Sequence, residues 1–304
     1  MVIVRPFTAC SSARRFYTAP MQKVLFTLAF LASAAAAVAQ VNVELVFDQE
    51  QFLRSESLPV RVRISNFSGQ PLRLGEEPDW LAFTIDREEG KALAKSGAIP
   101  MPKPFTIESA KTISLRLDLM PYFELNEAGR YKLTARVKVP QLEKELTTLP
   151  KHFDIVSGSK LWEKDVGVPG TTPPVARKFA LQQATFLKQA RLYVRLTDVT
   201  EANVVRVLPL GTLTSFSMPE AAVDSVSQLH VIFQNSQRGF LYSVVTPDGE
   251  QIIRQAFDMS GDRRPRLRAE PDGRLIVHGG QRRISLSDLP PPRVAETNDT
   301  TQSK

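Results

Sequence analysis

Alternation of apolar and polar residues is the dominant pattern of the chain from Val41 onward. Four segments carry apolar side chains at every second position: 41–47, 58–64, 113–119 and 131–137. Because successive side chains of a strand point to opposite faces, such a segment predicts a strand with one buried and one solvated face. Residues that favour turns separate these segments, as at Asn126–Gly129. The pattern predicts an all-β fold of antiparallel sheets.

The stretch from Leu125 to Ala135 contains the pattern Leu-x-x-x-Gly-x-Tyr-x-Leu-x-Ala, with Tyr131 at its centre. It resembles the entry to the penultimate strand of an immunoglobulin-like sandwich, and residues 59–66 are similar to the second strand of secreted bacterial domains of that type. The resemblance covers residues 40–156 and implies a sandwich in which the Tyr131 hydroxyl bonds to the preceding loop. It says little about activity, because this sandwich serves many unrelated functions.

A linker is expected over residues 157–174. Turn-forming residues gather at its two ends, at 157–159 and at 167–174, and either place can be the domain boundary. One short helix is expected over residues 175–190, because several apolar residues there share one helical face. These residues are Phe179, Ala180, Ala184, Phe186 and Leu187.

The sequence Leu-x-Val recurs at positions 192, 229 and 275, each time near a predicted hairpin. This spacing is typical of β-propeller blades, and Pro-Asp-Gly turns at 247–249 and 271–273 also predict hairpins. Residues 175–290 therefore resemble two to three propeller blades. A closed propeller needs at least about four blades. We therefore expect a partial-propeller-like second antiparallel β domain, either an open sheet or sandwich of its own or one packed on the first domain or another chain.

The N-terminal part of the chain indicates export. Residues 21–40 begin with a positive charge at Lys23, continue with an apolar stretch and end in Ala37-Val38-Ala39, which is the layout of a cleaved signal peptide. The alternative is an uncleaved anchor, although the apolar stretch is shorter than the ~20 residues of a spanning helix. The preceding residues resemble a transit peptide or lie before the true start at Met21. We expect residues 1–39 to be removed, a secreted or periplasmic location, and no later membrane span.

Removal of that leader changes the charge and the available chemistry. The chain has 39 basic and 32 acidic residues, and four of the basic residues lie before Gln40, so the mature part carries 35 against 32. This small excess does not favour a nucleic-acid partner. The only cysteine, Cys10, is lost with the leader. The mature chain therefore has no thiol for a disulfide, a metal site or a nucleophile.

Other candidate chemistry is sparse. His230 and His278 fall on the same strand parity, but no carboxylate lies near either at a metal-ligand spacing, so they are interpreted as ordinary strand residues and no metal is expected. No nucleophile elbow and no phosphate-binding glycine loop is present. The acidic pairs, such as Glu88-Glu89, lie in polar turns. No catalytic residue and no cofactor is predicted, and residues 291–304 are expected to form a disordered tail.

The best candidate binding surface is basic. Arginines gather near the end of the second domain, and alternate members would face one side of a strand over 265–269 if it pairs with a strand over 274–278. They are Arg264, Arg266, Arg268, Arg282 and Arg283. Such a cluster favours a protein or anionic glycan partner, although charge that protects a sheet edge gives the same pattern. We expect an exported, non-enzymatic binding or assembly protein of the cell envelope. The alternative is a secreted hydrolase with its site where the two domains meet.

Overall fold

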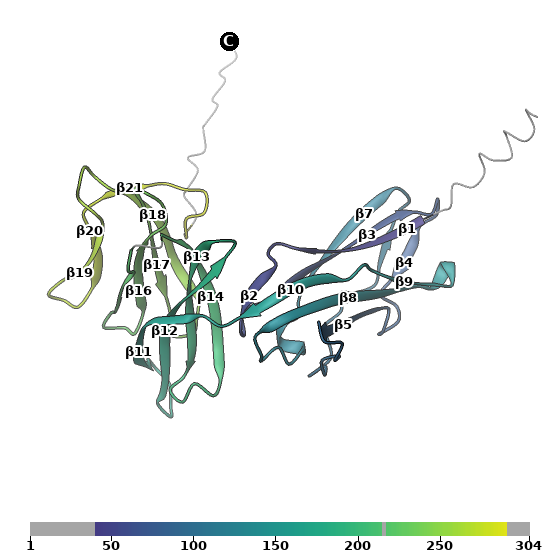
Figure 1. The fold of residues 1–304 in the computed structure, drawn as a ribbon, viewed down its shortest axis with the longest axis horizontal. Coiled ribbons are helices and arrows are strands. Elements are labelled where there is room, and N and C mark those ends of the chain that lie inside the picture. Colours follow the sequence, from purple (N-terminus) through teal and green to yellow (C-terminus); the bar gives the residue numbers. More distant parts are fainter. Residues whose placement is uncertain (1–39, 215–216, 291–304) are drawn as a thin grey trace, which may run out of the picture.

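The structure, a computed structural model, describes residues 40–214 and 217–290. It contains 21 strands, and within the described residues helical geometry is limited to two 3-10 turns, Met120–Tyr122 and Pro140–Leu142. The prediction of an all-β fold with antiparallel sheets is confirmed. Figure 1 shows the strands gathered in two lobes that meet near β2 and β10–β11. The predicted leader at 1–39 and the predicted tail at 291–304 lie outside the described residues.

The N-terminal lobe is built from two main sheets. One has the order β1-β3-β7 and the other the order β2-β10-β8-β5, with β9 paired to β8. A small pair, β4 with β6, completes the lobe. The bounds are β1 Gln40–Phe47, β2 Gln51–Leu53, β3 Pro59–Phe67, β4 Leu72–Leu74, β5 Leu81–Arg87, β6 Phe105–Ile107, β7 Lys111–Asp118, β8 Gly129–Val139, β9 Lys144–Thr147 and β10 Lys151–Val156.

The two sheets of this lobe share one apolar core. Alternate residues of β3, such as Val62 and Ile64, belong to the same buried cluster as Leu133 and Val137 of β8. Tyr131 is buried in this core, and its hydroxyl donates to the Glu127 carbonyl oxygen at 2.8 Å. The hydrogen bond predicted for Tyr131 is therefore confirmed.

The C-terminal lobe contains two antiparallel meanders. The first has the order β11-β12-β13-β14, and the second the order β15-β16-β17-β18-β21. Their bounds are β11 Ser159–Val168, β12 Val175–Phe186, β13 Gln189–Asp198, β14 Val204–Leu213, β15 Glu220–Val223, β16 Leu229–Gln234, β17 Gly239–Val245, β18 Gln251–Asp258 and β21 Gln281–Arg283. Phe179 and Val194 of the first sheet and Val231 and Phe233 of the second lie in one buried cluster, so the sheets pack face to face.

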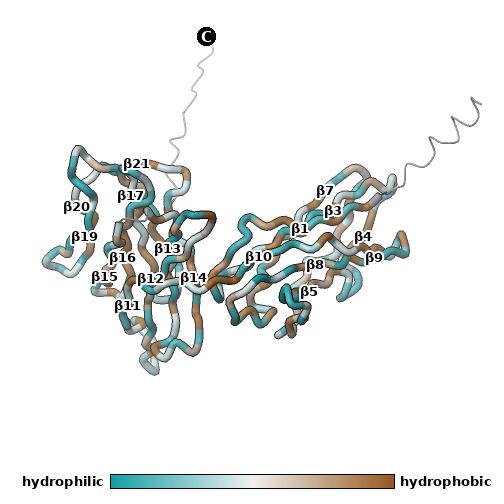
Figure 2. The backbone as a smooth tube through the Cα atoms, viewed as in Figure 1, coloured by the Kyte–Doolittle hydropathy of each residue, from teal (hydrophilic) through white to brown (hydrophobic). Residues whose placement is uncertain are grey.

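A hairpin forms a third layer on this lobe. It consists of β19 (Arg266–Ala269) and β20 (Leu275–His278). Leu267 and its cross-strand partner Val277 pack against buried residues of the second meander, among them Ile232 and Tyr242. In Figure 2 the strands of the packed sheets carry much of the brown.

The expected helix at 175–190 is wrong, because β12 occupies residues 175–186. β12 is a central strand with partners on both sides, β11 and β13. Phe179 and Leu181 face the other sheet, while Ala184 on the opposite face joins a cluster at the junction of the lobes. Burial on both faces removes the simple alternation of a half-exposed strand. Pairing on two sides also overrides the helical preference of its Ala, Leu, Gln and Lys residues.

Part of the predicted linker at 157–174 is also a strand. β11 begins at Ser159, and only residues 169–174 form the connection to β12. As an edge strand of the first meander, β11 exposes much of its length and therefore has a polar, linker-like composition. The third Leu-x-Val recurrence, at 275, lies in the two-stranded hairpin rather than in a further meander. No closed ring of sheets is formed by the described strands.

The two lobes meet at a short, close connection. Only Ser157 and Gly158 separate β10 from β11, and a Cβ on Gly158 would lie 2.9 Å from Leu53 Cδ2. Arg191 donates to Gln49 Oε1 at 2.8 Å across the junction, and Gln49 in turn donates to buried Glu56 at 3.0 Å. Burial raises the pKa of the Glu56 carboxyl, while the Leu53 N–H, Gln49 and Arg191 counteract that rise in part.

Candidate functional site

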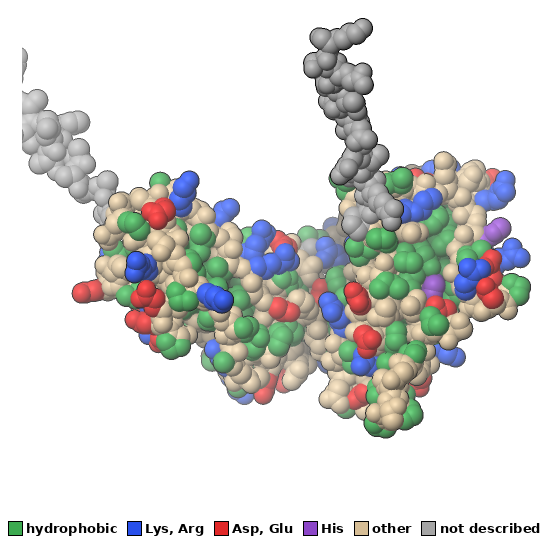
Figure 3. Space-filling view, turned by 180° about the vertical axis from the view of Figure 1, so that it is seen from behind, with side chains coloured by type: hydrophobic (Ala, Val, Ile, Leu, Met, Phe, Trp, Pro, Cys, Tyr) green, Lys and Arg blue, Asp and Glu red, His purple; other side chains and the backbone are tan. Residues whose placement is uncertain are grey.

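Three of the five arginines predicted from sequence lie together on the hairpin β19–β20 or at its base. Arg266 and Arg268 are in β19 and Arg264 precedes it, and all three are exposed. The predicted pairing of strands at 265–269 and 274–278 is confirmed by the register Arg266↔His278 and Arg268↔Ile276. Because Leu267 and Val277 face the lobe, alternate residues on both strands project outward. Figure 3 shows blue side chains along the outer margin of this lobe.

Turn chemistry holds the hairpin in this shape. Gly273 of the Pro-Asp-Gly turn has φ of +81°, and its N–H donates to the Glu270 carbonyl at 2.9 Å. After β20 the chain passes Gly279, where a Cβ would lie 2.9 Å from the Arg264 carbonyl oxygen. Glycine is needed at both positions because a side chain would be strained or would collide. The base of the hairpin, where Arg264 lies, is thus tightly packed backbone.

Two of these arginines have no anionic partner. Among the described residues, no carboxylate forms an ion pair with Arg264 or Arg268, whereas Arg266 lies 3.9 Å from Glu220. Glu220 also accepts a hydrogen bond from the Leu267 N–H at 3.0 Å, which ties β19 to β15. Guanidinium groups without partners are free to form bidentate hydrogen bonds to a carboxylate, sulfate or phosphate.

Arg282 and Arg283 lie elsewhere, on β21, and both are partnered. Arg282 bonds to Asp288 at 2.9 Å and to the Ala256 carbonyl at 3.1 Å, and Arg283 lies 3.2 Å from Asp258. Burial by itself raises the pKa of the Asp288 carboxyl, but the Ser285 N–H and Arg282 outweigh it and hold that pKa below its usual range. Arg282 therefore fastens the segment after β21 to the second meander.

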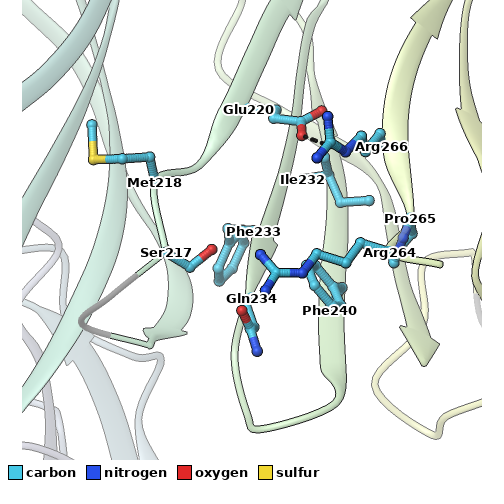
Figure 4. A pocket seen from close by; sticks show the side chains of 10 residues that line it. All are labelled: Ser217, Met218, Glu220, Ile232, Phe233, Gln234, Phe240, Arg264, Pro265 and Arg266. Atoms are coloured by element: carbon cyan, nitrogen blue, oxygen red, sulfur yellow. Dashed lines mark ion pairs between the residues drawn. The ribbon is translucent and has the colours of Figure 1, made fainter. Parts of the chain in front are cut away.

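A small pocket opens beside the hairpin base. It has a volume of about 140 Å³ and is lined by Arg264, Arg266 and residues of the second meander. Figure 4 shows the Arg264 side chain extending across the pocket toward Phe240, Gln234 and Ser217, and marks the Glu220–Arg266 ion pair. Sequence reasoning found the arginines but missed Ser217 and Gln234, which come close only through the sheet pairing.

The histidines do not form a joint site. His230 is buried between the second meander and the hairpin, whereas His278 is on the exposed face of β20. His230 Nδ1 lies 2.7 Å from the Tyr242 hydroxyl, and His230 Nε2 lies 3.0 Å from Asp224 Oδ2. The carboxylate can only accept, so His230 Nε2 donates to Asp224. Burial, together with Asp224, raises the pKa of Tyr242 to about 12, so the hydroxyl stays protonated.

This Asp224–His230–Tyr242 chain is another feature that sequence reasoning missed. His230 pairs with Val244 in the β16–β17 register, which places Tyr242 diagonally opposite on the same face. That geometry is available only once the hairpin register is known. No group of three or more His, Cys, Asp or Glu residues suited to a metal ion occurs within residues 40–214 and 217–290.

A larger groove of about 770 Å³ lies between the lobes, where the alternative hydrolase site was expected. Asp118 is the one carboxylate among its lining residues. Asp118 accepts hydrogen bonds from Ser57 Oγ at 2.7 Å, the Leu58 N–H at 2.8 Å and the Met120 N–H at 3.1 Å. These bonds brace the connections at the edge of the N-terminal lobe. The hydrolase alternative stays a prediction.

Comparison with known proteins assigns no family. No model of a known protein family matches the chain, and no curated protein matches it in sequence. In the part of the chain that the structure describes, no helix combines the length and apolar character needed to cross a membrane.

Proposed function

We propose that this chain is an exported, non-enzymatic binding or assembly protein of the cell envelope, which recognises a negatively charged protein or glycan partner. The proposed recognition surface is the outward face of the hairpin with its base, formed by Arg264, Arg266 and Arg268. The observation that carries the proposal is the exposure of these arginines, two of them without an anionic partner among the described residues.

The remaining parts of the molecule take supporting roles in this proposal. The N-terminal lobe serves as an immunoglobulin-like platform, in keeping with its two facing sheets and the Tyr131–Glu127 bond. The two meanders, which resemble propeller blades, present the hairpin. The tight junction around Gly158 favours a fixed relation between platform and hairpin. Export rests on the signal-like pattern of residues 21–40.

The test is direct binding of the purified protein to immobilised polymers. An acidic polysaccharide, polygalacturonate, and polyglutamate serve as anionic probes, and dextran serves as the neutral control. We expect binding to an anionic probe that weakens steeply between low and physiological salt, because exposed charges are screened over about 8–10 Å. Absence of binding to both anionic probes at low salt, or binding equal to that of dextran, would refute the proposal.

A further inference from the structure

We propose that the pocket at the hairpin base binds one carboxylate-bearing sugar unit, a uronic acid, of an anionic glycan. This inference rests on the proposed function, because it assigns a ligand class and a subsite to the same basic surface. The pocket is lined by Arg264, Ser217 and Gln234 together with apolar residues. Figure 4 shows these three side chains converging on one space.

Arg264 supplies the anion recognition. Its side chain lines the pocket and has no ion-pair partner among the described residues. A guanidinium in this position presents two parallel N–H groups, which match the two oxygens of a carboxylate. Arg266 also lines the pocket, but Glu220 lies 3.9 Å away and offsets its charge. Arg264 is therefore the principal cation for a ligand in the pocket.

The remaining polar groups suit a partner that carries hydroxyl groups. Gln234 Nε2 already donates to the Ser236 and Gln237 carbonyls, each at 2.9 Å, so its Oε1 is left as an acceptor. No described residue bonds to Ser217 Oγ, which is able to donate or accept. Glu220 adds a carboxylate at the same pocket.

This mixture of groups discriminates between two kinds of acidic ligand. An Asp or Glu side chain offers only acceptor oxygens when ionised, and these would meet Gln234 Oε1 and the Glu220 carboxylate unfavourably. A uronic acid offers a carboxylate to Arg264 and hydroxyl donors to the acceptors. The apolar wall, which includes Ile232, Phe240 and the exposed Met218, suits the C–H face of a sugar ring. Hence the pocket fits a uronic acid better than an Asp or Glu side chain.

The size of the pocket limits the ligand to a single unit. Its volume of about 140 Å³ is small beside the about 300–1,000 Å³ of pockets that enclose a whole drug-sized ligand. The pocket therefore accepts one carboxylate and part of the ring that carries it. The rest of a polymer would continue along the outward face of β19, past Arg266 and Arg268, which follow at alternate positions.

The experiment measures displacement of the protein from polygalacturonate by small competitors. The competitors are methyl glucuronoside, the uncharged methyl glucoside and N-acetylglutamate. We expect the glucuronoside to displace the protein. The glucoside should be at least about tenfold weaker, since it lacks the carboxylate and one charged hydrogen-bond pair is worth at least about 1.4 kcal/mol. N-acetylglutamate should also be weaker, because it has a carboxylate but no hydroxyl donors for Gln234 Oε1 and Glu220.

Two matched variants separate the pocket from the open face. Arg264→Gln removes the cation in the pocket, and Arg268→Gln removes an exposed arginine that does not line it. We expect Arg264→Gln to abolish competition by the glucuronoside and to weaken polymer binding about tenfold. Arg268→Gln should weaken polymer binding only about twofold and leave the competition intact. Thermal unfolding of both variants checks that the fold is unchanged. Arg264→Lys keeps the charge but not the two parallel N–H groups, so it tests whether charge alone is enough to bind the glucuronoside.

Failure of the inference is distinguishable from failure of the proposed function. If the wild-type protein binds neither anionic polymer, both are wrong. If polygalacturonate binds in a salt-sensitive way but the glucuronoside does not compete, or both glutamine variants lose equally, the basic face stands and the pocket assignment is overturned. If N-acetylglutamate competes as well as the glucuronoside, the ligand is an acidic peptide and the glycan assignment is overturned.

Discussion

Two strands of this molecule carry outward-facing cations at alternate positions, yet their surroundings differ. On β8 of the N-terminal lobe, all four such cations have carboxylate partners: Arg130 with Glu88, Lys132 with Asp86, Arg136 with Glu145, and Lys138 with Asp79. On β19 and its base, only Arg266 has an acidic neighbour among the described residues, at 3.9 Å. A similar run of basic residues is thus neutralised in one lobe and available in the other.

The difference comes from the neighbouring strands. Asp86 of β5 lies directly opposite Lys132, and Glu145 of β9 lies beside Arg136. Residues opposite the cations of β19 are Ile276 and His278 of β20, and neither brings a carboxylate. Cross-strand partners therefore decide whether a basic strand is a neutralised surface or a binding surface, because directly opposed side chains lie only about 5 Å apart. Counting arginines along a sequence does not separate the two cases.

The largest expected effect comes from removing the cations of each strand in turn. Arg264→Ser, Arg266→Ser and Arg268→Ser together should weaken binding to polygalacturonate by about 100-fold, since the loss of Arg264 alone accounts for about tenfold and the loss of Arg266 and Arg268 removes further charged contacts. The matched triple variant of Arg130, Lys132 and Arg136 to Ser should leave that affinity within about twofold, because these cations are already paired. Binding isotherms at low salt measure both. Equal losses would break the comparison.

A second variant gives a cation of the hairpin a cross-strand carboxylate partner, as the cations of β8 have. Ile276 lies opposite Arg268 and is partly exposed, so Ile276→Glu places a carboxylate beside that arginine. We expect about threefold weaker polymer binding, somewhat more than the loss of Arg268 alone, from pairing with Arg268 and repulsion of the anionic ligand. Ile276→Gln, which has the same shape without the charge, should bind nearly as the wild type does. A similar loss in both variants would attribute the effect to shape rather than charge.

Strands with one solvated face were predictable from sequence, and those buried on both faces were not. The alternation at 58–64 and 131–137 corresponds to β3 and β8, each with a clear inward set of residues. The sequence of β12 predicts a helix because both faces of the strand meet apolar neighbours and its composition favours helices. The sequence of the edge strand β11 predicts a linker for the opposite reason, since most of its residues are exposed and it has a polar composition.

The residues of the candidate site also fall into those that the sequence predicts and those that it does not. Arg264, Arg266 and Arg268 are close in sequence, so the alternation of a strand was enough to place them on one face. The pocket residues Ser217 and Gln234 reach Arg264 only because the hairpin folds over β15 and β16. Charge pairing also depends on the folded chain: Arg282 belongs to the same basic pattern as Arg264, yet it bonds to Asp288 six residues away and to the Ala256 carbonyl 26 residues away. Long-range pairing is the part that sequence patterns do not contain.

A third prediction concerns the tyrosine beneath the paired surface. The Tyr131 hydroxyl holds the Glu127 carbonyl, while the Glu127 side chain pairs with Arg87, whose guanidinium lies 5.8 Å from the centre of the Tyr131 ring. Tyr131→Phe should lower the unfolding free energy by about 1 kcal/mol, because one buried hydrogen bond is lost. Denaturant unfolding measures this. Tyr122→Phe is the control, since its hydroxyl bonds to no described residue. An unchanged stability in Tyr131→Phe would count against an immunoglobulin-like corner here.

The smallest effect is expected when the paired strand is made to resemble the free one. Asp86→Asn with Glu145→Gln releases Lys132 and Arg136 on the outer face of the N-terminal lobe. Because exposed pairs contribute about 0.2–1 kcal/mol each, stability should fall by no more than about 2 kcal/mol for the two pairs. At low salt, binding to polygalacturonate should strengthen about twofold, and that gain should vanish at physiological salt because the new cations act only through screened charge. Competition by methyl glucuronoside should not change, since the freed cations lie far from the pocket residues in the chain and line no part of it. If low-salt affinity for the polymer does not rise at all, the carboxylates on β5 and β9 are not what prevents the cations of β8 from binding it. The contrast between the two strands must then have another cause.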